Sequence, residues 1–252
     1  MTATLVQFPI SHFCEKARWS LDRAGVPYQV KNLAFGEHRF VVKRYGTSTV
    51  PVLLTAENVA IVDSDAILRW ADGRSTTSLF PSDAGRAAVD SLVADFDREL
   101  GPAVRVFAYS HLLPDLSAFR HTAFRELDPV RRALSSAAAR GLRAVMRRGF
   151  GIPRRVPRAI EKLDRLADRC DAALDGHEYL IGDTFTAADL VGASLWAPLL
   201  GVPGTPWEDI RVDALRTFAD ELNARPTGRW VHRTYARHRR QRPHWRWRPR
   251  PG

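Results

Sequence analysis

Two side chains near the N-terminus, Ser11 and Cys14, have the types and the spacing for thiol chemistry. The apolar residues around them recur at three- and four-residue steps, the spacing of one helix face: Phe13, Ala17, Leu21 and Ala24. Ser11 therefore stands at the N-cap of a predicted helix, with Cys14 in its first turn. Because the backbone N–H groups at a helix start are unpaired and carry partial positive charge, they stabilise an anion and lower the pKa of a cysteine there.

The cysteines and histidines also have structural interpretations. A cysteine one turn into a helix is often a small core residue, and we favour this interpretation of Cys14 over a catalytic one. His12 is interpreted as a general base, as a ligand contact, or as neither. Cys170 shares one helix face with Leu163 and Leu166 and is predicted to be core. The eight histidines form no cluster with metal-ligand spacing, so we expect no metal.

The elements that must position this segment alternate between strands and helices. We predict a strand at 4–8, the helix after Ser11, a strand at 27–32, at most one short helix at 39–45, a hairpin of strands at 50–54 and 59–62, and a helix at 63–72 that Gly73 closes. This order, β-α-β-(α)-β-β-α, is the layout of a thioredoxin-like domain.

Beyond this domain the pattern is helical throughout. Residues 74–85 are rich in Ser, Thr, Pro and Gly, which indicates a linker. Helices are predicted at 87–100, 118–148, 157–174, 187–199, 213–223 and 227–240. We therefore predict an α/β plus all-α chain: a thioredoxin-like thiol-binding domain at 1–75, a linker at 76–85, an all-helical bundle domain at 86–236, and a basic tail rich in Pro, Trp and Arg at 237–252.

Composition indicates a globular protein. The chain has 252 residues, of which 45% are hydrophobic and 26% charged, enough for one or two domains with a core. No apolar run approaches the roughly 20 residues that a membrane helix needs, and the N-terminus has no pattern of a secretory signal. Two cysteines are too few for a disulfide framework, so we expect a cytoplasmic protein with no membrane partner. The Arg- and Ala-rich composition is typical of a GC-rich bacterial genome.

The net charge of +10 is concentrated in two segments. Seven Arg and no acidic residue lie between Arg237 and Gly252, with Trp245 and Trp247 among them. Such a tail either binds nucleic acid or anionic lipid, or is a disordered solubilising segment. Its prolines favour the second interpretation, so we do not expect a nucleic-acid partner. Nine Arg and no acidic residue lie between 131 and 158, forming either a binding face for an anionic ligand or a solvated helix face.

Four motifs, in order, resemble the glutathione S-transferase superfamily, and the resemblance covers most of the chain. They are Ser11-His12-Phe13-Cys14, similar to the S/C-P-x-x active-site segment but with His12 for the proline; Thr49-Val50-Pro51-Val52-Leu53, similar to T-V-P-x-L with its cis proline; Asp63-Ser64-Asp65-Ala66-Ile67, similar to E/D-S-x-A-I; and Phe185-Thr186-Ala187-Ala188-Asp189-Leu190, similar to the T-x-A-D capping box. The last motif is structural, because Thr and Asp satisfy two backbone N–H groups at a helix start.

The resemblance implies a site for glutathione, or for another low-molecular-weight thiol such as mycothiol. Ser11 or Cys14 would be catalytic, and we favour Ser11 as the hydroxyl that activates the thiol. Ser64 would cap a helix and hold the γ-glutamyl carboxylate, with Asp63 or Asp65 near the amine. The residues implied to contact the thiol are His12, Phe13, Thr49, Val50, Pro51, Asp63, Ser64 and Asp65. The resemblance also implies a homodimer.

Three functions are compatible with these observations. The first, which we favour, is transfer of the thiolate to a hydrophobic electrophile, as in a glutathione transferase. The second is a thiol-dependent reductase or peroxidase that uses Cys14, and the third is a non-catalytic binding protein of the same fold. Eight apolar or aromatic residues after the linker either line an electrophile pocket or belong to the helical core: Phe96, Val106, Phe107, Tyr109, Leu112, Leu113, Phe119 and Phe124.

Overall fold

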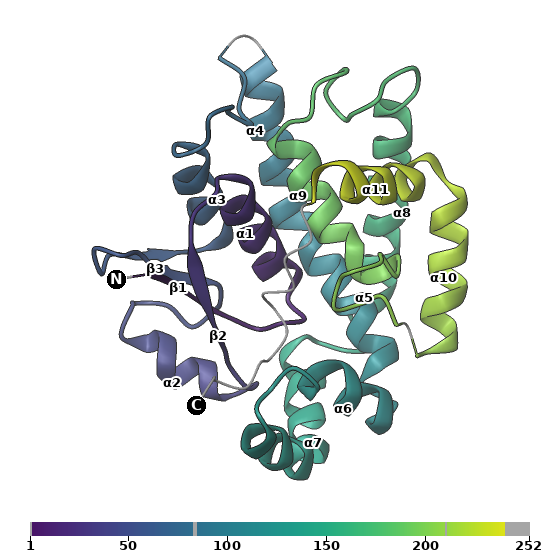
Figure 1. The fold of residues 1–252 in the computed structure, drawn as a ribbon. Coiled ribbons are helices and arrows are strands. Elements are labelled where there is room, and N and C mark those ends of the chain that lie inside the picture. The colour runs from purple at the N-terminus through teal and green to yellow at the C-terminus, as the bar shows by residue number, and fades with distance from the viewer. Residues whose placement is uncertain (1, 83–84, 210, 240–252) are drawn as a thin grey trace.

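The computed structural model describes residues 2–82, 85–209 and 211–239. Strands and helices alternate in the first part of the chain (Figure 1). The order is β1 (Ala3–Gln7), α1 (His12–Arg23), β2 (Tyr28–Asn32), α2 (Glu37–Lys43), β3 (Val52–Leu54), β4 (Ala60–Val62) and α3 (Ser64–Asp72). The predicted thioredoxin-like layout, with its short second helix, is confirmed.

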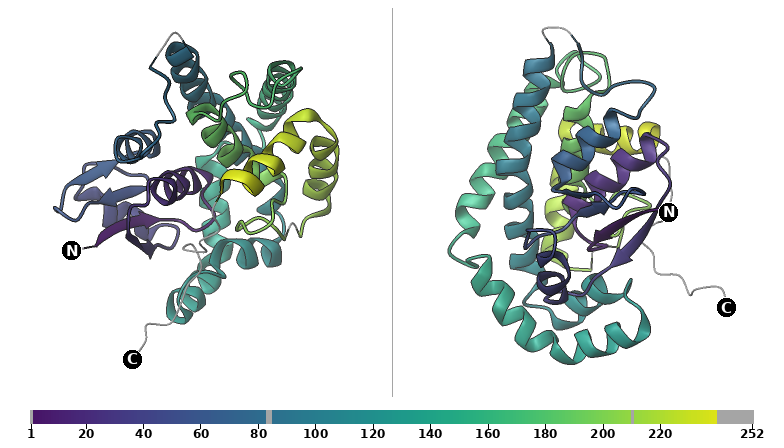
Figure 2. Two further views of the ribbon diagram at one scale, coloured as in Figure 1. Left: turned by 45° about the horizontal axis from the view of Figure 1, so that its top comes forward. Right: turned by 90° about the vertical axis from the view of Figure 1, so that its left-hand side faces the viewer.

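A helical region follows, as predicted. It comprises α4 (Gly85–Asp95), the π-helical turn η1 (Phe96–Leu100), α5 (Gly101–Leu112), α6 (Leu116–Phe124), α7 (Pro129–Gly149), α8 (Val156–Ala173), α9 (Ala187–Trp196), the 3-10 turn η2 (Ala197–Leu199), α10 (Asp213–Ala224) and α11 (Pro226–His238). Figure 2 shows α6 and α7 at one end of the molecule, beyond the sheet.

Two helix predictions are wrong. The sequence predicts that a helix ends at Gly101, but η1 runs directly into α5 there. Pro102 lies in the first turn of α5, where the N–H that proline lacks has no intrahelical partner anyway. The single helix predicted at 118–148 is two helices, because Asp128 caps α7 and Pro129 begins it.

The four strands form one mixed sheet that brings three distant segments to one edge. Their order is β2-β1-β3-β4, in which β1 and β2 are parallel and the other neighbours antiparallel. Val6, Val52 and Val62 pair in register and form a row across three strands. Close to this row, β1 leads into α1, the loop before β3 enters the sheet, and β4 leads into α3. The topology therefore gathers the three predicted site segments.

α1 is buried between the sheet and the helical region (Figure 1). Ala17 and Leu21 pack with the sheet core, while Trp19 belongs to the core of the helical region. The position of α1 therefore depends on both parts of the chain.

The charged residues of α1 are buried as well, which its amphipathic pattern does not predict. Arg18 Nε donates to Glu15 at 2.8 Å, and Arg239, directly after α11, donates to Glu15 at 2.8 Å and to Asp22 at 2.6 Å. Burial alone would raise the pKa of Glu15, but Arg239 and Arg18 outweigh it and hold that pKa below its ordinary value. We call Glu15, Arg18, Asp22 and Arg239 the Arg239 network. It joins the end of the helical region to α1.

The start of the predicted tail belongs to the folded structure. α11 continues to His238, and Arg239 is 9% exposed. The tail prediction therefore begins too early, because Arg239 is held by two buried carboxylates. The rest of the predicted tail, 240–252, lies outside the described residues.

The capping box predicted at Thr186 and Asp189 is present at the start of α9. The backbone N–H and the hydroxyl of Thr186 each donate to Asp189 at 3.0 Å. Asp189 also accepts from the N–H of Leu180 at 2.9 Å and from Trp230 Nε1 at 3.2 Å. The carboxylate thus has a structural role.

Across the described ranges, none of the helices combines the length and apolar character needed to cross a membrane.

We predict that Arg239→Ala lowers the free energy of unfolding by about 3–5 kcal/mol, because loss of one partner leaves buried charges uncompensated. The matched control is Arg237→Ala, since the Arg237 side chain is 53% exposed and pairs with Glu178 at the surface. Exposed pairs contribute only about 0–1 kcal/mol. Chemical denaturation of both variants at neutral pH measures the difference, and equal losses would contradict the prediction.

Candidate active site

Ser11 is the N-cap of α1, as predicted, and its backbone is extended there (φ −86°, ψ 123°). Its Oγ accepts a hydrogen bond from the backbone N–H of Cys14 at 3.3 Å. Since the oxygen is the acceptor in this bond, the hydroxyl proton can be donated to another group. The side chain is partly exposed. Ser11 thus presents a donor at the positive end of a helix.

Cys14 does not have the environment of a reactive thiol. It is fully buried, and burial raises the pKa of its thiol although Arg18 and Ser11 act in the opposite direction. The expected lowering of this pKa by the helix start is therefore wrong, because desolvation is the larger effect. Cys170 is also buried, which raises the pKa of its thiol to about 12. Both properties fit core cysteines.

We predict that neither cysteine of the native protein reacts readily with iodoacetamide at pH 7.5, because modification needs an accessible thiolate. Both Cys14 and Cys170 should react after unfolding in guanidinium chloride. Mass spectrometry of labelled peptides measures each site separately. Rapid labelling of Cys14 in the native protein would contradict this prediction and favour reductase chemistry.

His12 lies between α1 and α5. Its side chain is buried, and its Nε2 is 3.0 Å from the carbonyl oxygen of Gly101. Because a carbonyl oxygen only accepts, Nε2–H is the donor. Burial, together with the nearby Arg105, lowers the pKa of His12 from 6.5 to about 3, although the bond to Gly101 acts against this. The imidazole is therefore neutral and joins the two helices, in place of the base or ligand contact considered from the sequence.

We predict that the depressed pKa of His12 lowers the free energy of unfolding by about 2 kcal/mol when the pH falls from 7 to 5. The pKa of His12 is lower in the folded than in the unfolded state, so the unfolded state alone binds this proton between about pH 6.5 and pH 3. Stability present at neutral pH is thus lost as pH falls through that window. Urea denaturation should show a smaller acid loss in His12→Gln, and an unchanged loss in His177→Asn, which alters a half-exposed histidine. An unchanged loss in His12→Gln would refute this assignment.

α5 approaches the first turn of α1 very closely at Gly101. A Cβ at Gly101 would lie 2.3 Å from Cζ of Phe13, so any larger residue there would force the Phe13 ring to move. One turn further along α5, the guanidinium of Arg105 lies 5.8 Å from the Phe13 ring and 5.3 Å from the Phe150 ring. The Tyr109 ring lies 5.1 Å from that of Phe150. We call Phe13, Arg105, Tyr109 and Phe150 the Arg105 cluster.

Tyr109 and Arg105 bring polar groups from the helical region to the start of α1. Burial raises the pKa of Tyr109 to about 12, and the nearby Cys14 acts in the same direction, so the phenol is neutral. The sequence places Tyr109 among pocket or core residues and gives no signal for Arg105. Other candidates of that set are fully buried core residues: Phe96, Leu113, Phe119 and Phe124.

The loop before β3 contains the cis peptide bond between Val50 and Pro51 that the resemblance implies. Val50 precedes the paired residues of β3, so its backbone N–H and C=O are not part of the sheet ladder. Thr49 is exposed, and its N–H donates to the hydroxyl of Thr47 at 3.2 Å. This loop therefore offers backbone groups beside the sheet edge.

The N-cap of α3 is Asp63 and not Ser64, which corrects the predicted cap. Asp63 adopts φ +82°, and its carboxylate accepts from the N–H of Asp65 at 2.8 Å. Ser64 is the first residue of the helix and is buried. The Asp65 carboxylate is held by Arg69 at 2.8 Å and lies 3.8 Å from Lys16 Nζ. The last contact joins α3 to α1.

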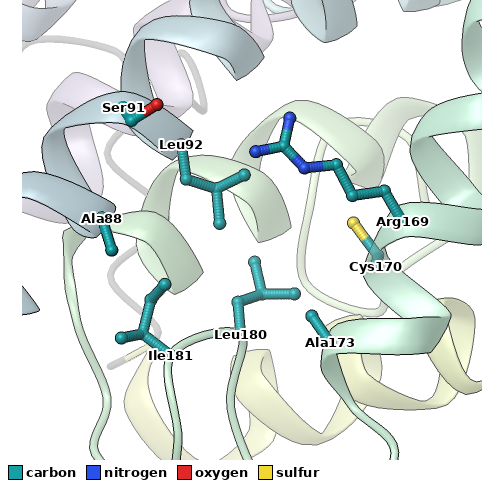
Figure 3. A pocket seen from close by; sticks show the side chains of 8 residues that line it. All are labelled: Ala88, Ser91, Leu92, Arg169, Cys170, Ala173, Leu180 and Ile181. Atoms are coloured by element: carbon teal, nitrogen blue, oxygen red, sulfur yellow. The ribbon is translucent and has the colours of Figure 1, made fainter.

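Figure 3 shows a hollow between α4, α8 and the loop at 180–181, whose lining does not include Ser11. Its volume is about 250 Å³, and its lining is mostly apolar: Ala88, Ser91, Leu92, Arg169, Cys170, Ala173, Leu180 and Ile181.

Within the described part of the chain, no group of three or more His, Cys, Asp or Glu is placed to hold a metal ion.

These observations define the class: a thioredoxin-like domain whose first helix and cis-proline loop meet at one sheet edge, followed by a helical region. Residues 5–78 match the family model described as "Glutathione S-transferase, N-terminal domain". The thioredoxin-like domain of this chain is therefore similar to the N-terminal domain of glutathione S-transferases.

Solved structures share this fold. They include a glutathione S-transferase from Rhodospirillum rubrum F11 (21% identity, 91% of each chain covered, TM-score 0.54) and a possible glutathione S-transferase from Rhodopseudomonas palustris (16%, 95% of each chain, 0.60). Another is a glutathione S-transferase from Methylobacillus flagellatus KT with glutathione bound (15%, 91% of this chain and 98% of that chain, 0.55). At these identities the likeness shows the fold alone. A comparison with curated protein sequences gives no match.

Proposed function

We propose that this protein binds glutathione, or another low-molecular-weight thiol such as mycothiol, and transfers the thiolate to a hydrophobic electrophile. The observation that carries the proposal is the common sheet edge. The register row of Val6, Val52 and Val62 lies where β1 leads towards Ser11 and α1, where the cis Val50-Pro51 loop enters β3, and where β4 leads into α3. A peptide-like thiol can contact all three segments at once.

Each segment offers chemistry that suits a thiol peptide. The backbone of Val50 can pair with an extended peptide, as an added strand does at a sheet edge. The start of α3, where Ser64 is the first helical residue, offers the positive end of a helix to a carboxylate. Asp63 and Asp65 place negative charge where an amine would bind, and Asp65 is already partly compensated by Arg69.

Ser11 would activate the thiol by donating its O–H to the sulfur. A free thiol has a pKa near 8.5, and both this hydrogen bond and the positive end of α1 favour the thiolate. The thiolate attacks the electrophilic carbon and a C–S bond forms. In a substitution, the leaving group departs with the electron pair of its bond to carbon, and the thiol proton passes to solvent.

The proposal extends to the setting of the protein. We expect a homodimer in a reducing cytoplasm, without a membrane or nucleic-acid partner. The free state of Cys14 and Cys170 suits a reducing compartment.

We predict that Ser11→Ala lowers kcat/KM for glutathione conjugation about 10- to 100-fold, because a hydrogen bond to a charged group contributes about 1.5–3 kcal/mol. The pH profile of kcat/KM should move to higher pH in this variant, since the bound thiol becomes less acidic. Cys14→Ala is the matched control and should keep both the rate and the profile.

Thermal-shift titrations of the wild-type protein with glutathione and with mycothiol come first. A shift with neither thiol would reject the proposal. Loss of activity in Cys14→Ala, with activity kept in Ser11→Ala, would replace it with the reductase function.

A further inference from the structure

Arg105 is a partly buried cation that lacks a partner in the described part of the chain. Its Nε is buried without a hydrogen bond, and no acidic side chain of those residues pairs with it. Arg143 and Arg233 also have a buried, unpaired Nε. Each of them, however, donates through a terminal nitrogen to a backbone carbonyl, of Pro114 at 3.1 Å and of Glu178 at 2.9 Å. Arg105 has no such bond to any residue that the structure describes.

The surroundings of Arg105 are aromatic. The rings of Phe13 and Phe150 lie 5.8 and 5.3 Å from its guanidinium. These rings compensate the charge only in part, because a cation over a ring gains far less than one paired with a carboxylate. Burial lowers the pKa of Arg105, but an arginine stays protonated at any physiological pH. The Arg105 cluster therefore holds a positive charge that the described residues do not neutralise.

This charge lies beside the proposed thiol site. Arg105 is close enough to His12 to lower the pKa of that imidazole, and His12 directly follows Ser11. Phe13, which Arg105 faces, lies in the same first turn of α1. Arg105 comes from the helical region, whereas the segments proposed for the thiol come from the sheet edge. A second reactant bound between the two would meet Arg105.

We infer that Arg105 binds a carboxylate of the electrophilic substrate, whose apolar part contacts Phe13 and Phe150. The inference rests on the proposed function and deepens it. A guanidinium offers two parallel N–H donors that match a carboxylate, and flat aromatic rings next to it suit an aromatic acid. The substrate class is thus an aromatic or extended apolar acid that carries an electrophilic carbon.

The test compares two electrophiles that differ in one charge, 4-chloro-3-nitrobenzoate and its methyl ester. With either one, the thiolate forms a C–S bond to the ring carbon and chloride leaves with the electron pair of the C–Cl bond. In Arg105→Met, kcat/KM for the acid should fall more than about tenfold, chiefly through KM, because a hydrogen bond to a charged group is lost. For the ester, kcat/KM should change less than about twofold in this variant. The pH profile of kcat/KM should stay where it is in the wild-type protein.

Arg143→Met is the matched control and should leave kcat/KM unchanged for both the acid and the ester. Arg105→Gln is a second variant for the case that Arg105→Met does not fold, and it should show the same selective loss. Equal losses for acid and ester, with the profile moved to higher pH, would overturn the inference and assign Arg105 to the thiolate instead.

Calorimetric binding of 3-nitrobenzoate, which has no leaving group, separates this inference from the proposed function. If the wild-type protein binds it and Arg105→Met does not, the carboxylate site stands even where neither electrophile is turned over, and the proposed transfer alone fails. Unchanged binding in Arg105→Met, or no binding to the wild-type protein, would overturn the inference.

Discussion

The position of the thioredoxin-like domain against the helical region depends on the charge pairing between α1 and the residue that follows α11. α1 carries Glu15, Arg18 and Asp22 into the interior, where unpaired charges would not be tolerated. Arg239 joins both carboxylates, and Arg18 also donates to Gln7 at the end of β1 at 2.6 Å. Because Ser11 is the first cap of this same helix, the Arg239 network also fixes where the proposed thiol donor stands.

A second set of contacts determines how α5 lies against α1. The family pattern has proline where this chain has His12, and a proline side chain has no donor for the carbonyl of Gly101. Here the imidazole makes that bond, while Phe13 packs on the bare Cα of Gly101. The two contacts bring Arg105 and Tyr109 to the first turn of α1. His12, the residue that departs from the family pattern, therefore makes one of the contacts that position the helical side of the site.

Local signals were sufficient for much of this structure. Strand periodicity, the Ser11 cap and the capping box of α9 depend on residues a few positions apart, so the sequence predicts them. The break expected at Gly101 fails because the first turn of a helix accepts proline. The burial of Glu15 and the place of Arg105 could not be predicted, because each depends on contacts with segments far along the chain. Only the fold determines which charges meet.

The position of Arg239 also has a consequence for the order of events during synthesis. Asp22 and its partner Arg239 are 217 residues apart. At about 5–20 residues per second, a ribosome needs roughly 10–40 s to make that stretch. Throughout this time the carboxylates of Glu15 and Asp22 have yet to meet Arg239, and within the Arg239 network only Arg18 is present to pair with Glu15. The buried charges of α1 can therefore be fully paired only after residue 239 has been made.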